Sequence, residues 1–191
     1  MTAIAHRVSA VQRWAWIDPG HCDPVWDMYC EAFTDIDRQA AQRHLMTRAE
    51  FGHVMTDERV GKYLAYADDQ VVGQAVITND LAAWPLISPR YFETHWPELY
   101  AARRIFYIGY VCTSPDAPNH TFHDLIAEMS GPVFAADGMA VMDFCAVNTD
   151  ALHLPRHVGI LLDHLNPAAD PKRIDRQEFW AWRFDGQPWA S

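Results

Sequence analysis

The stretch IFYIGYVC at residues 105–112 decides the fold. It is an almost unbroken run of apolar and aromatic side chains, which predicts a strand that is buried on both faces. A helix is predicted to follow it, with apolar residues at helical spacing, from about Asn119 to Asp137. A buried strand that leads into such a helix predicts an α/β domain, in which helices cover a central sheet.

Working outward, further strands are predicted at residues 13–17, 62–67, 71–78, 141–147 and 178–184. Asp68-Asp69-Gln70 lies between two of them and is a tight hairpin signal. Further helices are predicted from about Asp23, at residues 37–46, at residues 47–55 and between Pro155 and His164. Thr47 and Glu50 have the spacing of a capping box. This order predicts an α/β (α+β) fold, with a mixed, mostly antiparallel sheet flanked by helices in one domain over residues 1–191.

An aromatic-rich insertion at about residues 81–104 separates two predicted strands by more than a hairpin needs. Its aromatic residues are Trp84, Tyr91, Phe92, Trp96 and Tyr100. Such a segment can form a lid over a cleft, a dimer surface or a satellite core on the sheet edge. The sequence leaves these three alternatives open.

The composition limits the classes of partner that the protein is expected to bind. Half of the 191 residues are hydrophobic, and the net charge is −10. A negative surface disfavours nucleic acid and anionic membranes as partners, because phosphate binding needs a basic patch. No apolar run approaches the length of a membrane helix. The four cysteines are scattered and no export signal is visible, so a cytoplasmic protein with reduced thiols is expected. The expected partner is a small-molecule ligand.

The order of elements, over nearly the whole chain, resembles the GNAT superfamily of acyl-coenzyme A (acyl-CoA) dependent N-acyltransferases. Three local matches carry the resemblance. The hairpin at residues 67–73 resembles the family's second and third strands, and the strand that ends in Thr113-Ser114-Pro115-Asp116 resembles its fourth. Asn148, followed by Ala151, Leu154 and Val158-Gly159-Ile160, resembles the stretch after the fifth strand. The resemblance implies transfer from acetyl-CoA or another acyl-CoA to a small-molecule or peptide amine, often by a homodimer.

The chain departs from the family in its phosphate loop and its acid. The family's loop after the fourth strand carries glycines that let backbone N–H groups approach the pyrophosphate of the coenzyme. Residues 118–123 read PNHTFH and keep neither a glycine nor an arginine. The family's frequent tyrosine acid corresponds to Pro155, and residues 105–112 lack the glutamate that often serves as base. The helix N-terminus remains as a binding site for an anion.

The resemblance implies cofactor-binding roles for Val111, Cys112, Thr113, Asn119, His120, Thr121, Phe122, His123 and His157. The backbone at residues 111–113 is expected to pair with pantetheine as an added strand does. The candidate catalytic residues are Asp80, at the end of the third strand, Tyr110 and Asn148. Asp80 is also explained as a turn cap. Cys112 is a candidate nucleophile, but a buried thiol is more often inert packing.

Other polar residues have structural explanations. The pairs His120/His123 and His153/His157 have spacings that suit a metal, but no closing cysteine or clear carboxylate accompanies them, so no metal is expected. Asp143 lies inside an apolar predicted strand. A buried carboxylate needs a partner, so we expect it to pair with an arginine or a backbone donor.

Two other functions stay open at this stage. The lost glycines and Pro155 also fit a GNAT-like small-molecule binding module, or an enzyme that has abandoned coenzyme A. The aromatic insertion also fits a structural or partner-binding protein, with the insertion as its interface.

Overall fold

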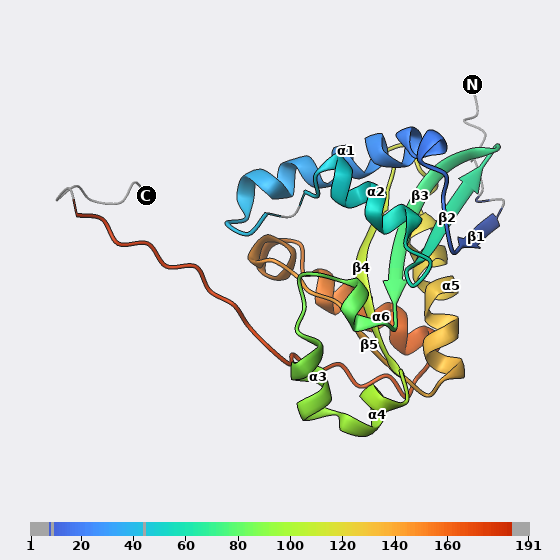
Figure 1. Ribbon diagram of the computed structural model, residues 1–191. Helices are drawn as coiled ribbons and strands as arrows, with labels where there is room; N and C mark the ends of the chain where they lie inside the picture. Colours follow the sequence, from blue (N-terminus) through green and yellow to red (C-terminus); the bar gives the residue numbers. More distant parts are fainter. Residues whose placement is uncertain (1–7, 9, 44, 185–191) are drawn as a thin grey trace.

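The structure is a computed structural model that describes residue 8, residues 10–43 and residues 45–184 (Figure 1). Its strands form one sheet in the order β1-β2-β3-β4-β5. They are β1 (Ala10–Trp14), β2 (Gly61–Ala67), β3 (Gln70–Thr78), β4 (Ile105–Thr113) and β5 (Met139–Val141). β1 to β4 pair in succession as antiparallel strands, and β5 pairs with β4 in parallel. The predicted mixed, mostly antiparallel sheet is confirmed.

Helices cover both faces of this sheet (Figure 1). They are α1 (Asp23–Gln39), α2 (Arg48–Thr56), α3 (Pro89–His95), α4 (Pro97–Ala101), α5 (Thr121–Ala135) and α6 (Leu154–Leu165). Side chains of α1, α2 and the insertion form one hydrophobic cluster on the sheet, and α5 with part of α6 forms the other. Among the helices of the described residues, none combines the length and the apolar composition that a bilayer span requires.

Two short-range predictions are confirmed in detail. Asp68 and Asp69 turn the β2–β3 hairpin with φ angles of 48° and 63°, the left-handed pair that a type I′ turn needs. Thr47 and Glu50 form the capping box of α2, since each side chain accepts a hydrogen bond from the other residue's backbone N–H. Both signals depend on contacts within a few residues, which is why the sequence carries them.

The predicted helix over residues 37–46 is wrong. Helix α1 continues to Gln39, and Ala40 is extended, with φ −108° and ψ 136°. The backbone beyond it is held by side chains instead of helical bonds. The N–H of Met46 donates to the hydroxyl of Tyr29 at 3.0 Å, and the N–H of Leu45 donates to Asp37. These long-range contacts favour a loop over a helix.

The insertion packs on the sheet, in agreement with the satellite-core alternative. Trp84 and Phe92 are buried in the same hydrophobic cluster as α1 and α2. Tyr91, Trp96 and Tyr100 pack against that cluster and remain partly exposed. Most of the aromatic surface of residues 81–104 is therefore used inside the chain.

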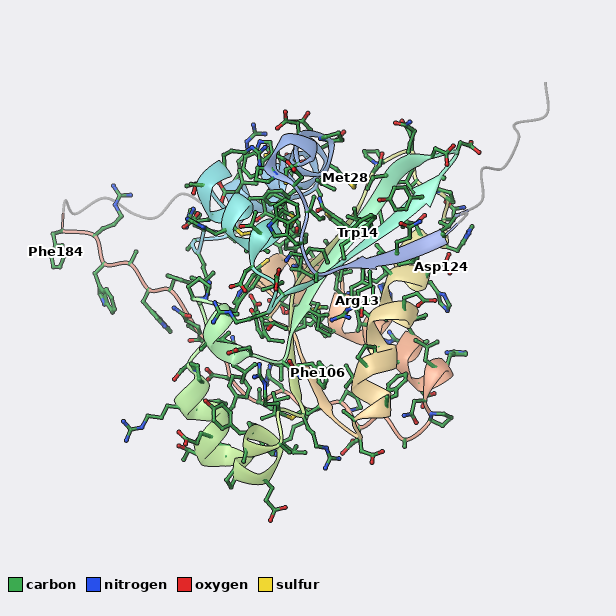
Figure 2. The ribbon with its side chains drawn as sticks, turned by 45° about the vertical axis from the view of Figure 1, so that its right-hand side comes forward. Arg13, Trp14, Met28, Phe106, Asp124 and Phe184 are labelled. Atoms are coloured by element: carbon green, nitrogen blue, oxygen red, sulfur yellow. The ribbon has the colours of Figure 1, made fainter. Side chains whose placement is uncertain are left out.

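Both strands predicted after β4 need correction. β5 ends at Val141, residues 142–145 are irregular, and a π-helical turn occupies Val147–Ala151, so the predicted strand over 141–147 is largely absent. Residues 178–184 form no strand, although their alternating pattern predicted one. Their aromatic side chains are exposed, and Phe184 projects away from the rest of the chain (Figure 2). An alternating pattern marks a segment that is suited to pairing, but it does not supply the partner.

Candidate functional site

The candidate site lies where β4 and β5 separate. β4 pairs with β3 from Thr113–Gly73 to Tyr107–Thr78. It pairs with β5 through Ile105, Phe106 and Tyr107 alone. From Ile108 to Thr113, the other edge of β4 therefore has no strand partner in the described part of the chain. A strand edge of this kind offers backbone N–H and C=O groups to an extended ligand.

A bulge at Gly109 marks the point of separation. Val76 pairs with Tyr110 and Ile77 pairs with Ile108, so Gly109 is the extra residue. The indole ring of Trp84 lies against it, because a Cβ added at Gly109 would come within 2.3 Å of the ring. The glycine is therefore required by the close approach of an aromatic side chain from the insertion.

A tyrosine and an aspartate meet beside this bulge. Tyr107 is buried, and its hydroxyl donates to Oδ1 of Asp143, 36 residues further along the chain. Burial and the charge of Asp143 raise the pKa of Tyr107, so the phenol remains a donor. Asp143 itself is exposed. The expectation that Asp143 is buried and paired with an arginine or a backbone donor is therefore wrong: its partner is a phenol, and the carboxylate faces solvent.

The N-terminus of α5 follows the unpaired edge. Its first turn lies against β3, because a Cβ on Gly73 would come within 2.8 Å of the Cγ2 of Thr121. The N–H of Thr121 donates to Pro118, and that of Asp124 donates to His120. Within the described residues, the N–H groups of Phe122 and His123 have no backbone acceptor. The buried hydroxyl of Thr121 also has no hydrogen-bond partner there. Backbone N–H groups of this kind are the ones through which helix N-termini generally bind anions.

Side chains of the same turn modify this end of the helix. His120 Nε2 lies 3.5 Å and His123 Nδ1 lies 3.4 Å from the carboxylate of Asp124, and both imidazoles are about half exposed. Phe122 turns inward and packs against the cluster under α5. The histidines therefore lie at the surface. Asp124 places a negative charge in the first turn of α5.

Sequence comparison finds no relative: no family model and no curated protein matches this chain. Solved structures do match. The aminoglycoside N-acetyltransferase AAC(6')-Iy, in complex with CoA, has a TM-score of 0.52 at 12% identity, over 96% of this chain and 99% of that one. The chain has the GNAT N-acyltransferase fold.

Two further structures with the same arrangement support this assignment. An aminoglycoside acetyltransferase from an uncultured soil metagenomic sample, in complex with trehalose, has a TM-score of 0.51 at 10% identity, over 90% of this chain and 96% of that one. An integron cassette protein from the mobile metagenome of V. cholerae has a TM-score of 0.51 at 14% identity, over 93% of each chain. The GNAT resemblance stated from the sequence is therefore confirmed for the fold.

The predicted GNAT site residues lie at several places in the fold. Val111 and Thr113, which are partly buried, lie on the unpaired part of β4 and lead to Asn119, His120, Thr121, Phe122 and His123 at the start of α5. Asn148 lies in the π-helical turn after β5, and its buried Oδ1 has no hydrogen-bond partner in the described residues. His157 is exposed on α6.

Tyr110 and Cys112 are parts of the core. The hydroxyl of Tyr110 donates to Gln74 at 3.1 Å, and the amide of Gln74 donates in turn to the backbone of Val25. Burial raises the pKa of Tyr110 well above its usual value and raises the pKa of the Cys112 thiol to about 12. A thiol that stays protonated is a poor nucleophile, so the structure favours the packing explanation of Cys112.

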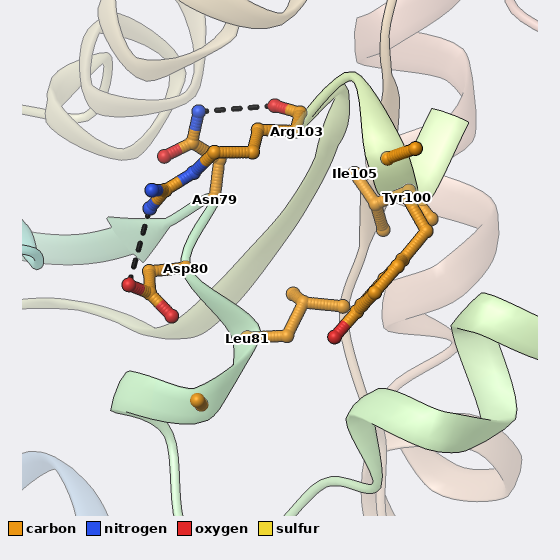
Figure 3. Close-up of a pocket in the computed structure, with 8 residues that line it drawn as sticks. Asn79, Asp80, Leu81, Tyr100, Arg103 and Ile105 are labelled. Carbon is orange, nitrogen blue, oxygen red and sulfur yellow. Dashed lines mark hydrogen bonds and ion pairs between the residues drawn. The ribbon is translucent and has the colours of Figure 1, made fainter. Parts of the chain in front are cut away.

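Asp80 lies at the other end of the sheet. It follows the residues of β3 that pair with the start of β4, whereas α5 follows the end of β4. Its carboxylate lies 3.1 Å from the guanidinium of Arg103, beside a cavity of about 260 Å³ (Figure 3). A second cavity of about 200 Å³ lies beside the β2–β3 hairpin. Neither cavity is lined by residues 111–113 or 120–123.

Sequence reasoning missed three residues of the site: Trp84, Gly109 and the partner of Asp143, Tyr107. A glycine inside an apolar strand is a recognised sign of a bulge, so Gly109 could have been found. The Tyr107–Asp143 hydrogen bond joins residues that are far apart in sequence, and no local pattern predicts it. No group of three or more potential metal ligands occurs among the described residues.

Proposed function

We propose that this protein is an N-acyltransferase that moves an acyl group from coenzyme A to the amine of a small molecule or peptide. One observation carries the proposal. In a GNAT fold, the edge of β4 from Ile108 to Thr113 has no strand partner in the described chain, and it leads to the free N–H groups of α5. An extended thioester with amide groups and phosphates has the shape and polarity that such an edge and helix end can bind.

In this proposal, the pantetheine arm of the donor pairs with the backbone of Val111–Thr113. Among the described residues, two buried oxygens near this edge have no hydrogen-bond partner, Oγ1 of Thr121 and Oδ1 of Asn148. The unpaired backbone of β4 suits the pantetheine half of the coenzyme. The phosphate half has fewer protein donors, because the glycines of the family loop are absent and Asp124 repels an anion. Contacts from His120 and His123 take the place of the usual cradle.

The acceptor amine is bound at Asp143. Tyr107 uses one carboxylate oxygen, which leaves Oδ2 of Asp143 for the amine at the exposed side. The neutral amine nitrogen attacks the thioester carbonyl carbon, and its proton passes to this carboxylate as the bond forms. The C–N bond forms, the C–S bond breaks, and the coenzyme leaves as a thiolate that takes its proton from solvent. Tyr110 has no proton-transfer role in this scheme, because its hydroxyl is enclosed and bonded to Gln74.

Calorimetric titration of the full chain with acetyl-CoA and longer acyl-CoA thioesters tests donor binding. We expect binding that weakens when His120 and His123 are replaced by alanine, since these side chains supply the phosphate contacts. Absence of binding at millimolar thioester would overturn the proposal.

Thiol release in the presence of an amine library tests the chemistry. We expect Asp143→Asn to lower kcat by about 10²–10⁴-fold, the usual contribution of a positioned base, and to leave thioester affinity unchanged. Asp163→Asn is the matched control, because Asp163 is an exposed aspartate on α6. Equal rates for the two variants would remove Asp143 from the mechanism and leave the donor site to be judged by the titration alone.

A further inference from the structure

The cavity beside Asp80 shares no lining residue with the proposed transfer site. Its lining residues are Asn79, Asp80, Leu81, Ala82, Tyr100, Ala101, Arg103 and Ile105 (Figure 3). Its volume of about 260 Å³ equals that of roughly nine water molecules in the liquid. This is enough for a metabolite of about a dozen non-hydrogen atoms. The cavity is therefore the size of a small ligand.

The cavity has one charged side and one apolar side. Asp80 and Arg103 form an ion pair in which Nη2 of Arg103 lies 3.1 Å from Oδ2 of Asp80. The opposite side is formed by Leu81 and Ile105, which are 4% and 1% exposed, and by the ring of Tyr100 (Figure 3). An opposed arrangement of charge and apolar surface orients a ligand that carries both.

The ion pair leaves groups for a ligand. The contact joins Nη2 of Arg103 to Oδ2 of Asp80, and we expect Oδ1 of Asp80 and the other N–H groups of Arg103 to be open to a ligand. The side chain of Arg103 is 59% exposed. A guanidinium binds a carboxylate through two parallel hydrogen bonds, and a carboxylate binds an ammonium group. A zwitterion can therefore dock head-to-tail on the pair without breaking it.

The backbone of Arg103 is unusual for its position. Arg103 follows the end of α4, where its N–H donates to Tyr100 and the next N–H, of Arg104, donates to Leu99. This is a Schellman motif, whose left-handed residue is most often glycine. Arg103 has a φ of 53°, and its carbonyl accepts a hydrogen bond from the side chain of Asn79 at 3.0 Å. An arginine at this position, held by Asn79, keeps a charge over Asp80 at the cost of about 1–2 kcal/mol of backbone strain.

We propose that this cavity binds a small zwitterion with an apolar body, of the class of free amino acids with aromatic or branched aliphatic side chains. The carboxylate of the ligand binds Arg103, its ammonium group binds Asp80, and its side chain lies against Leu81, Ile105 and Tyr100. Donor binding on β4 does not require this site, so the two proposals stand separately.

Calorimetric titration of the full chain with L-phenylalanine and L-leucine tests this site. We expect binding that is lost for the N-acetyl derivatives, which lack the ammonium group, and for the amides, which lack the carboxylate. Asp80→Asn and Arg103→Gln are each expected to weaken binding about tenfold or more, because each removes a charge-assisted hydrogen bond. Asp35→Asn, in the exposed Arg38–Asp35 pair of α1, is the matched control and leaves affinity unchanged.

A third variant keeps the test independent of the ion pair. Ala101 is exposed at the cavity, so Ala101→Phe fills the space without disturbing the core and is expected to abolish binding while thermal unfolding stays unchanged. The proposal is overturned if neither amino acid binds at millimolar concentration, or if Ala101→Phe and both charge variants bind as the unmodified chain does. Acetyl-CoA titrations of the same variants should match those of the unmodified chain.

Discussion

The two edges of β4 have different roles. Towards β3, the strand is paired at six register positions, and α5 packs over this part of the sheet. Towards β5, it is paired at three positions and then separates at the Gly109 bulge. Within the described residues, one strand is therefore paired inside the core on one edge and largely unpaired on the other. Because the side chains of β4 are mostly apolar, the polar groups along its free edge are those of the backbone.

The difference between the edges extends to the helices that follow. α5 contributes several buried residues to the core, whereas no residue of α6 is buried. Stability should therefore depend on the paired side, and function should depend on the open side. Substitutions at Met129, at Gly109 and at the C-terminal tryptophans test this division.

Met129→Ala should have the largest effect. Met129 is 0% exposed on α5, so its truncation leaves a cavity under the paired part of the sheet. We expect the free energy of unfolding to fall by about 2–5 kcal/mol. Ile160→Ala on α6 is the control, because Ile160 is 49% exposed and should cost about 0.5 kcal/mol or less. Urea denaturation measures both, and equal losses would contradict the division between the two sides.

Gly109→Ala should have an intermediate effect. The new methyl group would lie within 2.3 Å of the Trp84 ring, so the indole must move away from the bulge. We expect a loss of about 1–3 kcal/mol in the free energy of unfolding. In a Trp84→Phe background, the smaller ring leaves room for the methyl group, and the loss should shrink. A double-mutant cycle in urea measures this coupling; additive losses would show that Trp84 does not determine the choice of glycine.

The same division explains how much the sequence predicted. The hairpin at Asp68-Asp69, the capping box of α2 and the strand at residues 105–112 were predicted correctly, because each depends on neighbours within one or two turns. The open side was predicted poorly. β5 stops at Val141, and the hydrogen bond of Asp143 to Tyr107 spans 36 residues, so the pattern of residues 141–147 contains neither fact.

The candidate site follows the same rule. The succession from Val111 and Thr113 to the start of α5 was predicted from the order of elements, since a helix that follows a strand brings its N-terminus to the strand's end. The roles of side chains were less predictable. Asp80 is engaged with Arg103 at the other end of the sheet, and Tyr110 is enclosed by a bond to Gln74. Both depend on which residues the fold brings opposite them.

The C-terminal segment should show the smallest effect, and it tests the wrong prediction of a closing strand. Trp180 and Trp182 are 72% and 73% exposed, so replacing each by serine removes little buried surface. We expect the free energy of unfolding to change by about 0.5 kcal/mol or less, measured in urea at two protein concentrations. If residues 178–184 instead pair with a sheet edge in solution, these tryptophans become buried, and the loss should approach the 3–5 kcal/mol typical of buried tryptophan. A loss that depends on protein concentration would indicate pairing with a second copy, because association stabilises by mass action. A loss that does not depend on protein concentration would indicate pairing within one chain. If the partner were the free edge of β4, the unpaired part of that edge would be shorter than in the described residues.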